Sequence, residues 1–397
     1  MRGIAEAFRR YSDLLCQSDI RRSFWAALAG KFQPGMYGLS LFLVLSSHFD
    51  YGEAALVSSG AALGSMTTPL RGRMLDRFGY GPVLWPLLAL HLAGLGVLLG
   101  AVEKALSLPV LFSLTVFVSM VMPPVGTVTR VMWQARTSGD SRTTALALDA
   151  ILADLGFMVG PILAVVIAHA VHPSASLIVC GGLMAVSVPL ALRGAVRGSS
   201  LRPRERGHWA GPLQRAAARR IFATAMFFFF GVSSVEIVLA SYGSGEEVTV
   251  AGGVLLGIVA GASMIGGFIL GGVSSCLTKN LMRPEVVLGA ISCAVLILAG
   301  ALALVPDLAY VACVIVGIFL GPCFAAIYGA AGDIATVGEE SETQSWVASS
   351  MMVGGALGTA VGGWGVQQYG LAATVMMAGV AMMLGAMAGH FSPRSRA

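Results

Sequence analysis

Charged residues are scarce in this chain of 397 residues and make up only 11% of it. A soluble globular protein carries roughly a quarter charged residues, because water must solvate its surface. Half that supply is too little to cover a water-exposed surface, so a soluble globular fold is excluded. Hydrophobic types reach 56% and there are 51 glycines, a composition typical of membrane helices that pack closely through small residues.

The sequence also lacks the short motifs of the common enzyme classes. It contains no phosphate-binding G-x-x-x-x-G-K-[ST], no G-x-S-x-G nucleophile elbow and no H-E-x-x-H metal site. Its six cysteines form no C-x-x-C pair, so no metal and no cofactor is expected. Apart from the net charge of +5, nothing favours nucleic-acid binding. These absences exclude the ATP-driven pumps and the common hydrolases, and we expect no enzyme.

Long apolar runs are what the sequence has in abundance. A bilayer core of about 30 Å requires about 20 apolar residues per helix. Runs of that length predict an all-α polytopic membrane protein with twelve transmembrane helices. The predicted spans are 23–46, 53–70, 82–101, 107–129, 144–170, 174–192, 221–243, 248–275, 284–305, 309–331, 343–366 and 371–391.

The basic residues predict the orientation of these helices. With the N-terminus inside, 23 of the 25 basic residues fall on the cytoplasmic side, as the positive-inside rule requires. Among them, Arg71 is expected in the loop after the second span and Arg130 near the loop after the fourth. An even number of spans places the C-terminus inside too, and a prokaryotic inner membrane is the expected location. The expected divisions are a cytoplasmic segment at 1–22, six-helix bundles at 23–192 and 221–391, a basic linker at 193–220 and a tail at 392–397. The first segment is expected either to lie on the membrane surface as a helix or to be a disordered tail.

The two halves of the sequence resemble each other at an offset of about 200 residues. Pro124 in the fourth predicted helix corresponds to Pro322 in the tenth, and residues 158–164 correspond to residues 352–358. Matches in the same order at nearly one offset predict two six-helix bundles in parallel repeat. Such an architecture suits rocking of one bundle against the other around a site near the membrane midplane.

A glycine-rich charged loop follows the second predicted helix. It contains Gly72, Asp76, Arg77 and Gly79; the glycines permit a tight turn, and the charges can pair with the facing bundle. This loop resembles the corresponding motif of the major facilitator superfamily, although positions 80 and 81 lack the basic residues usual there. The resemblance implies a secondary transporter of the same helix count, and it covers the whole chain.

The fifth predicted helix carries a second motif. Gly156, Gly160 and Pro161 resemble the G-x-x-x-G-P sequence of the antiporter branch of that superfamily. Glycines four residues apart share one helix face and permit close packing, and proline bends the helix. The resemblance favours export over uptake, although any small-x-x-x-small seam packs helices whatever the direction of transport. The arginine that drug exporters commonly carry in the middle of the fourth helix is missing near Met122.

Ionisable residues within the predicted spans are the candidate functional groups, because a charge in the membrane is costly unless it lines a cavity. Glu236, in the seventh helix, is the first candidate for a proton carrier or an anchor for a cation; its alternative role is a structural hydrogen bond. Asp154 and Asp149 lie on different faces of the fifth helix. Asp154 is a candidate coupling residue, whereas Asp149 is expected mainly to pair with arginines in a structural or gating role.

Three further polar residues lie in predicted spans. Lys31, with Gln33 beside it, is expected to contact an acidic substrate, to neutralise a nearby aspartate, or to extend toward the membrane surface. His91 is a candidate proton relay, although a lone histidine more often serves as hydrogen-bonded packing.

These features together predict a proton-coupled exporter of a small organic molecule that works as a monomer by alternating access. Its partners would be the substrate, protons and the lipid bilayer. An uptake symporter or facilitator is the first alternative. The second alternative is a sensor or assembly partner that resembles a transporter and moves nothing.

Overall fold

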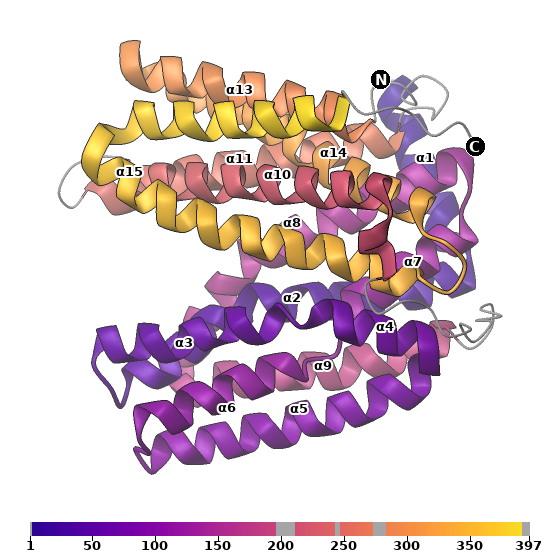
Figure 1. Ribbon diagram of the computed structural model, residues 1–397, viewed down its shortest axis with the longest axis vertical. Helices are drawn as coiled ribbons and strands as arrows, with labels where there is room; N and C mark the ends of the chain where they lie inside the picture. Colours follow the sequence, from indigo (N-terminus) through magenta and orange to yellow (C-terminus); the bar gives the residue numbers. More distant parts are fainter. Residues whose placement is uncertain (1, 196–210, 243–246, 273–282, 391–397) are drawn as a thin grey trace.

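The computed structural model describes residues 2–195, 211–242, 247–272 and 283–390, and within these ranges the chain is helical and contains no strand (Figure 1). The first half contains α1 (Arg2–Cys16), α2 (Ser18–Ser46), α3 (Tyr51–Ser65), α4 (Thr68–Phe78), α5 (Tyr80–Glu103), α6 (Leu108–Met120), α7 (Val125–Arg136), α8 (Gly139–Ala170) and α9 (Pro173–Ala195). The second contains η1 (Gly211–Gln214), α10 (Ala216–Ala240), α11 (Glu247–Gly272), α13 (Pro284–Leu304), η2 (Pro306–Leu308), α14 (Ala309–Ile334) and α15 (Glu340–His390).

Turn residues and prolines set where these helices begin and end. Asp50 and Glu53 form a capping box at the start of α3, and Pro284 occupies the first turn of α13, where its missing N–H leaves no bond unmade. Gly79 separates α4 from α5 with a φ of +83°, and Gly370 divides α15 with a φ of +80°. Both angles are costly for a residue with a side chain, so a glycine is required at each turn.

Within the described residues, each predicted span overlaps one helix or two consecutive helices, and the spans 343–366 and 371–391 both overlap the single helix α15. In the described part of the chain, nine helices are long and apolar enough to cross a membrane. α15 counts once among the nine although it covers two predicted spans. The segment of α6 and α7 counts once among the nine although it is interrupted at residues 121–124, whereas α2 and the α3–α4 pair are not among them. The protein is thus an all-helical integral membrane protein.

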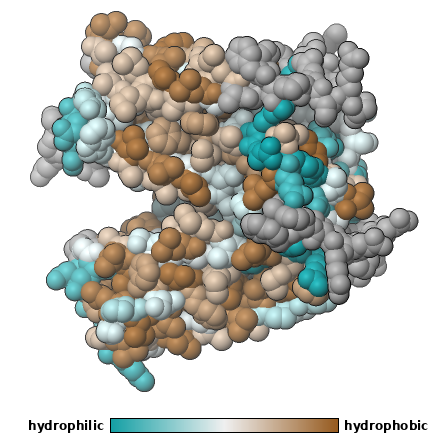
Figure 2. Space-filling view, in the orientation of Figure 1, coloured by the Kyte–Doolittle hydropathy of each residue, from teal (hydrophilic) through white to brown (hydrophobic). Residues whose placement is uncertain are grey.

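The helices pack in two groups, which we call the N-terminal half (α2–α9) and the C-terminal half (α10–α15) (Figure 1). The largest apolar core contains only residues of the C-terminal half, such as Phe228 and Leu298, and two smaller cores belong to the N-terminal half. Apolar side chains are exposed in both halves, such as Leu70 of α4 and Leu384 of α15. Figure 2 shows hydrophobic surface over the visible face of both halves. This exposure suits a protein surrounded by lipid. Most of the predicted linker and the predicted C-terminal tail lie outside the described residues.

The two halves meet at one end of the molecule and separate at the other. The closed end carries α1, the α4–α5 turn and the beginning of α15, whereas the open end carries the α2–α3 turn and the bend of α15 at Gly370 (Figure 1). Figure 2 shows a hollow between the halves at the open end. α1 is a helix packed on the protein, where the Tyr11 hydroxyl donates to the Gly267 carbonyl of α11 at 3.2 Å.

Candidate functional site

A cavity of about 200 Å³, open to solvent on one side, lies between the two halves. It is lined by α2, α4, α7, α8, α9 and the segment 122–124 from the N-terminal half, and by α10, α14 and α15 from the C-terminal half. Its titratable lining residues, apart from one tyrosine, all come from the N-terminal half, and they are Lys31, Arg71, Arg130 and Asp149. The cavity wall therefore carries three cationic groups against one carboxylate.

Asp149 lies at the centre of an ion-pair cluster. Its Oδ2 atom accepts from Lys31 Nζ at 3.0 Å, and from Arg130 Nε and Nη2 at 2.9 and 2.8 Å. Its Oδ1 atom has no partner among the described residues. All three side chains are at least nine-tenths buried, so the two cations stabilise a carboxylate whose burial would otherwise be costly.

Close packing of α2 on α8 places Lys31 opposite Asp149. A Cβ atom on Gly156 would meet the Lys31 carbonyl, and one on Gly160 would lie 2.8 Å from the carbonyl carbon of Gly35. Asp149 is seven residues before Gly156, so it lies on the same face of α8, two turns nearer the closed end. The C-terminal half repeats this seam, since a Cβ atom on Gly354 or Gly358 of α15 would meet backbone atoms of α10.

Arg71 fills a break between α6 and α7. Pro123 and Pro124 lack an N–H, so the helix is interrupted there and the carbonyl of Met122 is left free. Arg71 donates to this carbonyl and, at 2.7 Å, to the hydroxyl of Thr68, and its Nε atom is buried without a partner. Both acceptors are neutral, so these hydrogen bonds leave the charge of Arg71 uncompensated.

The C-terminal half supplies an apolar wall. Phe229 of α10 and Phe324 of α14 stack edge to face with ring centroids 6.0 Å apart, and Met351 and Met352 of α15 lie beside them. The Tyr328 ring covers the guanidinium of Arg130 with 3.4 Å between the Arg130 Cζ and the ring centroid. The cavity thus presents cations on one side and aromatic and thioether groups on the other.

Glu236 is not part of this cluster. It is exposed on α10 seven residues beyond Phe229, on the same helix face and about 10 Å nearer the open end. Among the described residues its carboxylate has no hydrogen-bond or ion-pair partner. It therefore lies on the way from the open end to the cavity.

Asp154 and His91 make no hydrogen bond to the cluster within the described residues, although Asp154 interacts electrostatically with Lys31. Asp154 Oδ2 accepts from the Ser263 hydroxyl of α11 at 2.5 Å, so this buried bond joins the two halves. His91 is fully buried between α5 and α6, where its Nδ1 donates to the Val118 carbonyl at 3.0 Å. Gln33 lines the cavity next to Lys31, and both polar atoms of its side chain are buried without a partner.

The loop motif forms part of the closed end. The two carboxylate oxygens of Asp76 accept from the backbone N–H groups of Ser341 and Glu342, at 3.0 and 2.7 Å, and so cap the beginning of α15. Asp76 lies beyond the predicted span that ends at residue 70, and burial raises its pKa to about 6 against the opposing effect of these hydrogen bonds. Arg77, by contrast, is exposed and lies over the ring of Phe78 rather than against the C-terminal half.

Further contacts between the halves surround Asp76. A Cβ atom on Gly72 would lie 2.6 Å from the Ser341 carbonyl oxygen, which shows how closely α4 approaches α15. The Gln134 amide of α7 donates to the Tyr328 carbonyl at 2.8 Å, and Arg142 pairs with Asp333 at 2.8 Å. These bonds close one end of the cavity.

Two of the cavity cations, Arg71 and Arg130, lie inside the protein and not in the cytoplasmic loops where the sequence predicts them. Arg71 and Arg130 were counted among the cytoplasmic loop charges, and the fourth span was described as lacking an arginine. In the structure α4 and α7 continue to residues 78 and 136, beyond the predicted ends at 70 and 129, so both arginines are buried in helices. The Pro123–Pro124 pair is the signal for the break that brings Arg130 inward, because a helix that restarts there continues into the charged segment.

Comparison with known proteins identifies the fold. The model of the Major Facilitator Superfamily matches residues 23–326. No curated protein sequence matches the chain at a significant level.

Solved structures of transporters resemble the chain over nearly its whole length. A bacterial homologue of the iron transporter ferroportin in an outward-facing state superposes with a TM-score of 0.74 at 14% identity, covering 96% of this chain and 98% of that chain. The E. coli fucose–proton symporter FucP gives 0.70 at 13% identity, with 98% and 100% covered. The human organic anion transporter MFSD10 gives 0.66 at 15% identity, with 93% and 98% covered. At these identities the likeness concerns the fold alone.

Proposed function

The chain belongs to the Major Facilitator Superfamily, and on this premise we propose that it is a secondary transporter that exports a small organic molecule in exchange for protons. The observation that carries the proposal is the cavity between the halves, which is lined by buried charges, open at one end and closed at the other. Such a cavity is what alternating access requires of a site that faces one side of the membrane at a time.

The orientation we propose has both chain ends in the cytoplasm, with twelve transmembrane helices in bundles at 23–192 and 221–391. This arrangement follows the distribution of basic residues. It makes the closed end cytoplasmic, so the cavity of this conformation faces outward. The membrane would be a prokaryotic inner membrane, and the protein would work as a monomer.

We propose Glu236 as the residue that takes up the proton. It is exposed on the same face of α10 as Phe229 but nearer the open end, without a partner among the described residues, so protons on the outer side can reach it. Asp149 is a weaker choice, because two cations hold its carboxylate ionised at Oδ2. Asp154 joins the halves through Ser263, so this bond must rearrange when the halves rock.

In the proposed cycle Glu236 loads a proton from outside while the cavity is open there. Neutralisation removes the cost of enclosing this carboxylate, so the open end can close around it and the contacts of Asp76 and Gly72 at the other end can break. Deprotonation to the cytoplasm then accompanies loading of the substrate, and the loaded protein returns to the outward state.

The first alternative is uptake by proton symport or by facilitated diffusion, which the same cavity would serve. The glycine–proline motif of α8 favours export on resemblance, and its close packing on α2 would be equally useful in either direction. A sensor or assembly partner that transports nothing is less well supported, because such a protein would not require a solvent-open cavity with buried cations.

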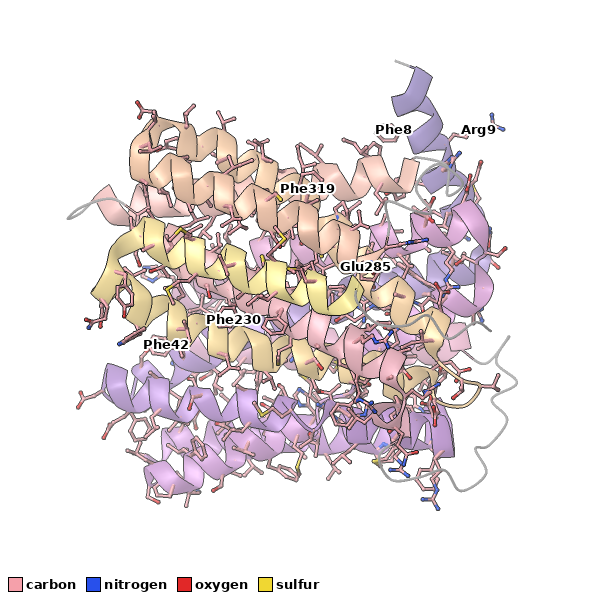
Figure 3. The ribbon with its side chains drawn as sticks, turned by 45° about the horizontal axis from the view of Figure 1, so that its top comes forward. Phe8, Arg9, Phe42, Phe230, Glu285 and Phe319 are labelled. Carbon is pink, nitrogen blue, oxygen red and sulfur yellow. The ribbon has the colours of Figure 1, made fainter. Side chains whose placement is uncertain are left out.

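The test is proton movement in liposomes that contain purified protein, with a panel of candidate substrates added. Wild-type protein should move protons only when a substrate is present, in the direction opposite to the substrate. Glu236→Gln should abolish this coupled movement, whereas Glu285→Gln, the same change at the beginning of α13 (Figure 3), should leave it unchanged. Protons and substrate moving in the same direction would establish symport instead. Substrate flux without protons would refute the coupling.

A further inference from the structure

Among the residues that the structure describes, the cations on the cavity wall outnumber the carboxylates that face them. Of the three cations that line the cavity, Lys31 and Arg130 share the carboxylate of Asp149, and Lys31 also interacts electrostatically with Asp154 without an ion-pair contact. Within the described residues, Arg71 donates hydrogen bonds to the neutral oxygens of Met122 and Thr68 and has no carboxylate partner. A buried cation without a counter-ion is costly unless an anion reaches it.

Unused hydrogen-bond donors lie beside these cations. The Nε atom of Arg71 and the Nε2 atom of Gln33 are both buried with no hydrogen-bond partner in the described part of the chain, and both residues line the cavity. The partners of Lys31 and Arg130 leave further N–H groups available, since an ammonium has three donors and a guanidinium five. Buried donors left unpaired are expensive, so the wall fits a ligand that brings acceptor oxygens.

The facing wall fits a different part of the same ligand. Phe229, Phe324 and Met351 offer apolar surface, and no charged side chain of the C-terminal half lines the cavity within the described residues. Such a wall excludes the water that would otherwise solvate the charges opposite. A ligand that spans the cavity must therefore be charged at one end and apolar at the other.

We propose that the transported substrate is an organic anion whose acidic group, a carboxylate, phosphate or sulfonate, binds Arg71, Lys31 and Gln33, and whose apolar body packs against Phe229, Phe324 and Met351. This inference rests on the proposed transport function and names its substrate class. Asp149 then has a defined role: it sets the net charge of the site, so that the anion meets an excess of positive charge without three bare cations.

The first test measures the thermal stability of the purified full-length protein with matched probes. These are benzoate, 2-naphthoate, octanoate and phenyl phosphate, each paired with its neutral amide or alcohol and with a cationic amine of the same body. At least one anion should raise the melting temperature while its neutral and cationic partners do not. Acetate, which lacks the apolar body, should bind more weakly. The proposal would be overturned if the amines or the neutral compounds stabilised the protein, or if no anion did. It would also be overturned if the only stabilising anion were phosphatidylglycerol, a lipid of the bilayer.

Charge variants test the same idea with opposite signs. Lys31→Gln should weaken binding of the stabilising anion about tenfold and Asp149→Asn should strengthen it about tenfold, because each shifts the charge near the anion by one unit in a partly buried site. Arg9→Gln removes an exposed cation of α1, which points away from the helices in Figure 3, and should change nothing. Equal effects of Lys31→Gln and Arg9→Gln would contradict the assignment. The ligand panel on the wild-type protein decides the matter if a variant fails to fold.

Flux in liposomes separates this proposal from the one on which it rests. An anion that binds with the expected charge dependence but never crosses the membrane would leave the binding site standing and refute transport. Coupled transport confined to neutral or cationic compounds would support the transport function and refute the organic-anion site.

Discussion

Gly72→Ala is expected to open the closed end of the cavity. The added methyl group would lie 2.6 Å from the Ser341 carbonyl oxygen and closer still to the Ser345 hydroxyl. The hydroxyl can rotate away, but the carbonyl belongs to the first turn of α15 and is fixed by the helix. α4 and α15 must therefore separate by part of an ångström, which strains the capping of α15 by Asp76.

The size of the effect follows from the cost of overpacking. An extra methylene in a well-packed contact costs about 1–3 kcal/mol. A conformation in which α4 and α15 have separated does not contain this clash. The equilibrium between that conformation and the one seen here therefore shifts by roughly 5- to 150-fold, at 1.36 kcal/mol for each factor of ten. Gly81→Ala is the matched control, because a Cβ atom at Gly81 meets nothing within 4 Å.

Hydrogen exchange at both ends of the molecule measures this shift. In the Gly72→Ala protein, amides at the beginning of α15 should exchange faster, and amides of the α2–α3 turn should become better protected as the opposite end closes. Gly81→Ala should match wild type at both ends. Faster exchange everywhere would indicate loss of stability rather than a change of state. Unchanged exchange at the beginning of α15 would refute the claim that Gly72 sets the distance between the halves.

Three further changes test the closed end. Burial raises the pKa of Asp76 to about 6 from an ordinary value of about 3.9, so closing this end takes up a proton. The closed end should therefore become more stable as the pH falls from 7 toward 4 and less stable as the pH rises through 6. Exchange of α15 amides measures this pH dependence, which Asp76→Asn should abolish. Tyr11→Phe removes the bond to Gly267 and should release α1 by about 1 kcal/mol, visible as faster exchange of α1 amides. Arg142→Gln breaks the half-exposed ion pair with Asp333 and should shift the equilibrium less than the Gly72 change does, since such pairs contribute about 0–1 kcal/mol.

Much of the architecture could be predicted from the sequence, because the membrane imposes a length and a polarity on every helix. The predicted span 23–46 became α2 (Ser18–Ser46), and the span 284–305 became α13 (Pro284–Leu304). Shared helix faces were also predictable from spacing. Asp149 and Gly156 do lie on one face of α8, and that face packs on α2.

Contacts between distant segments could not be predicted. Asp76 accepts hydrogen bonds from backbone groups 265 and 266 residues further along the chain, and a backbone N–H carries no sequence signal. Arg71 and Arg130 were assigned to loops because a charge at the end of an apolar run usually marks the membrane surface. Here the helices continue past that point, and a neutral carbonyl and a buried aspartate hold the two charges inside.

The central claim, that this cavity faces one side of the membrane at a time, is tested most directly by thiol labelling of a cysteine at Ala153, which lines the cavity on α8. A membrane-impermeant maleimide would be applied to right-side-out and inside-out vesicles, with wild-type protein setting the background from its own cysteines. We predict labelling from the outer side for Ala153→Cys, and a shift toward the cytoplasmic side when Gly72→Ala is added. Labelling from both sides at equal rates in one protein, or from neither side, would contradict alternating access through this cavity.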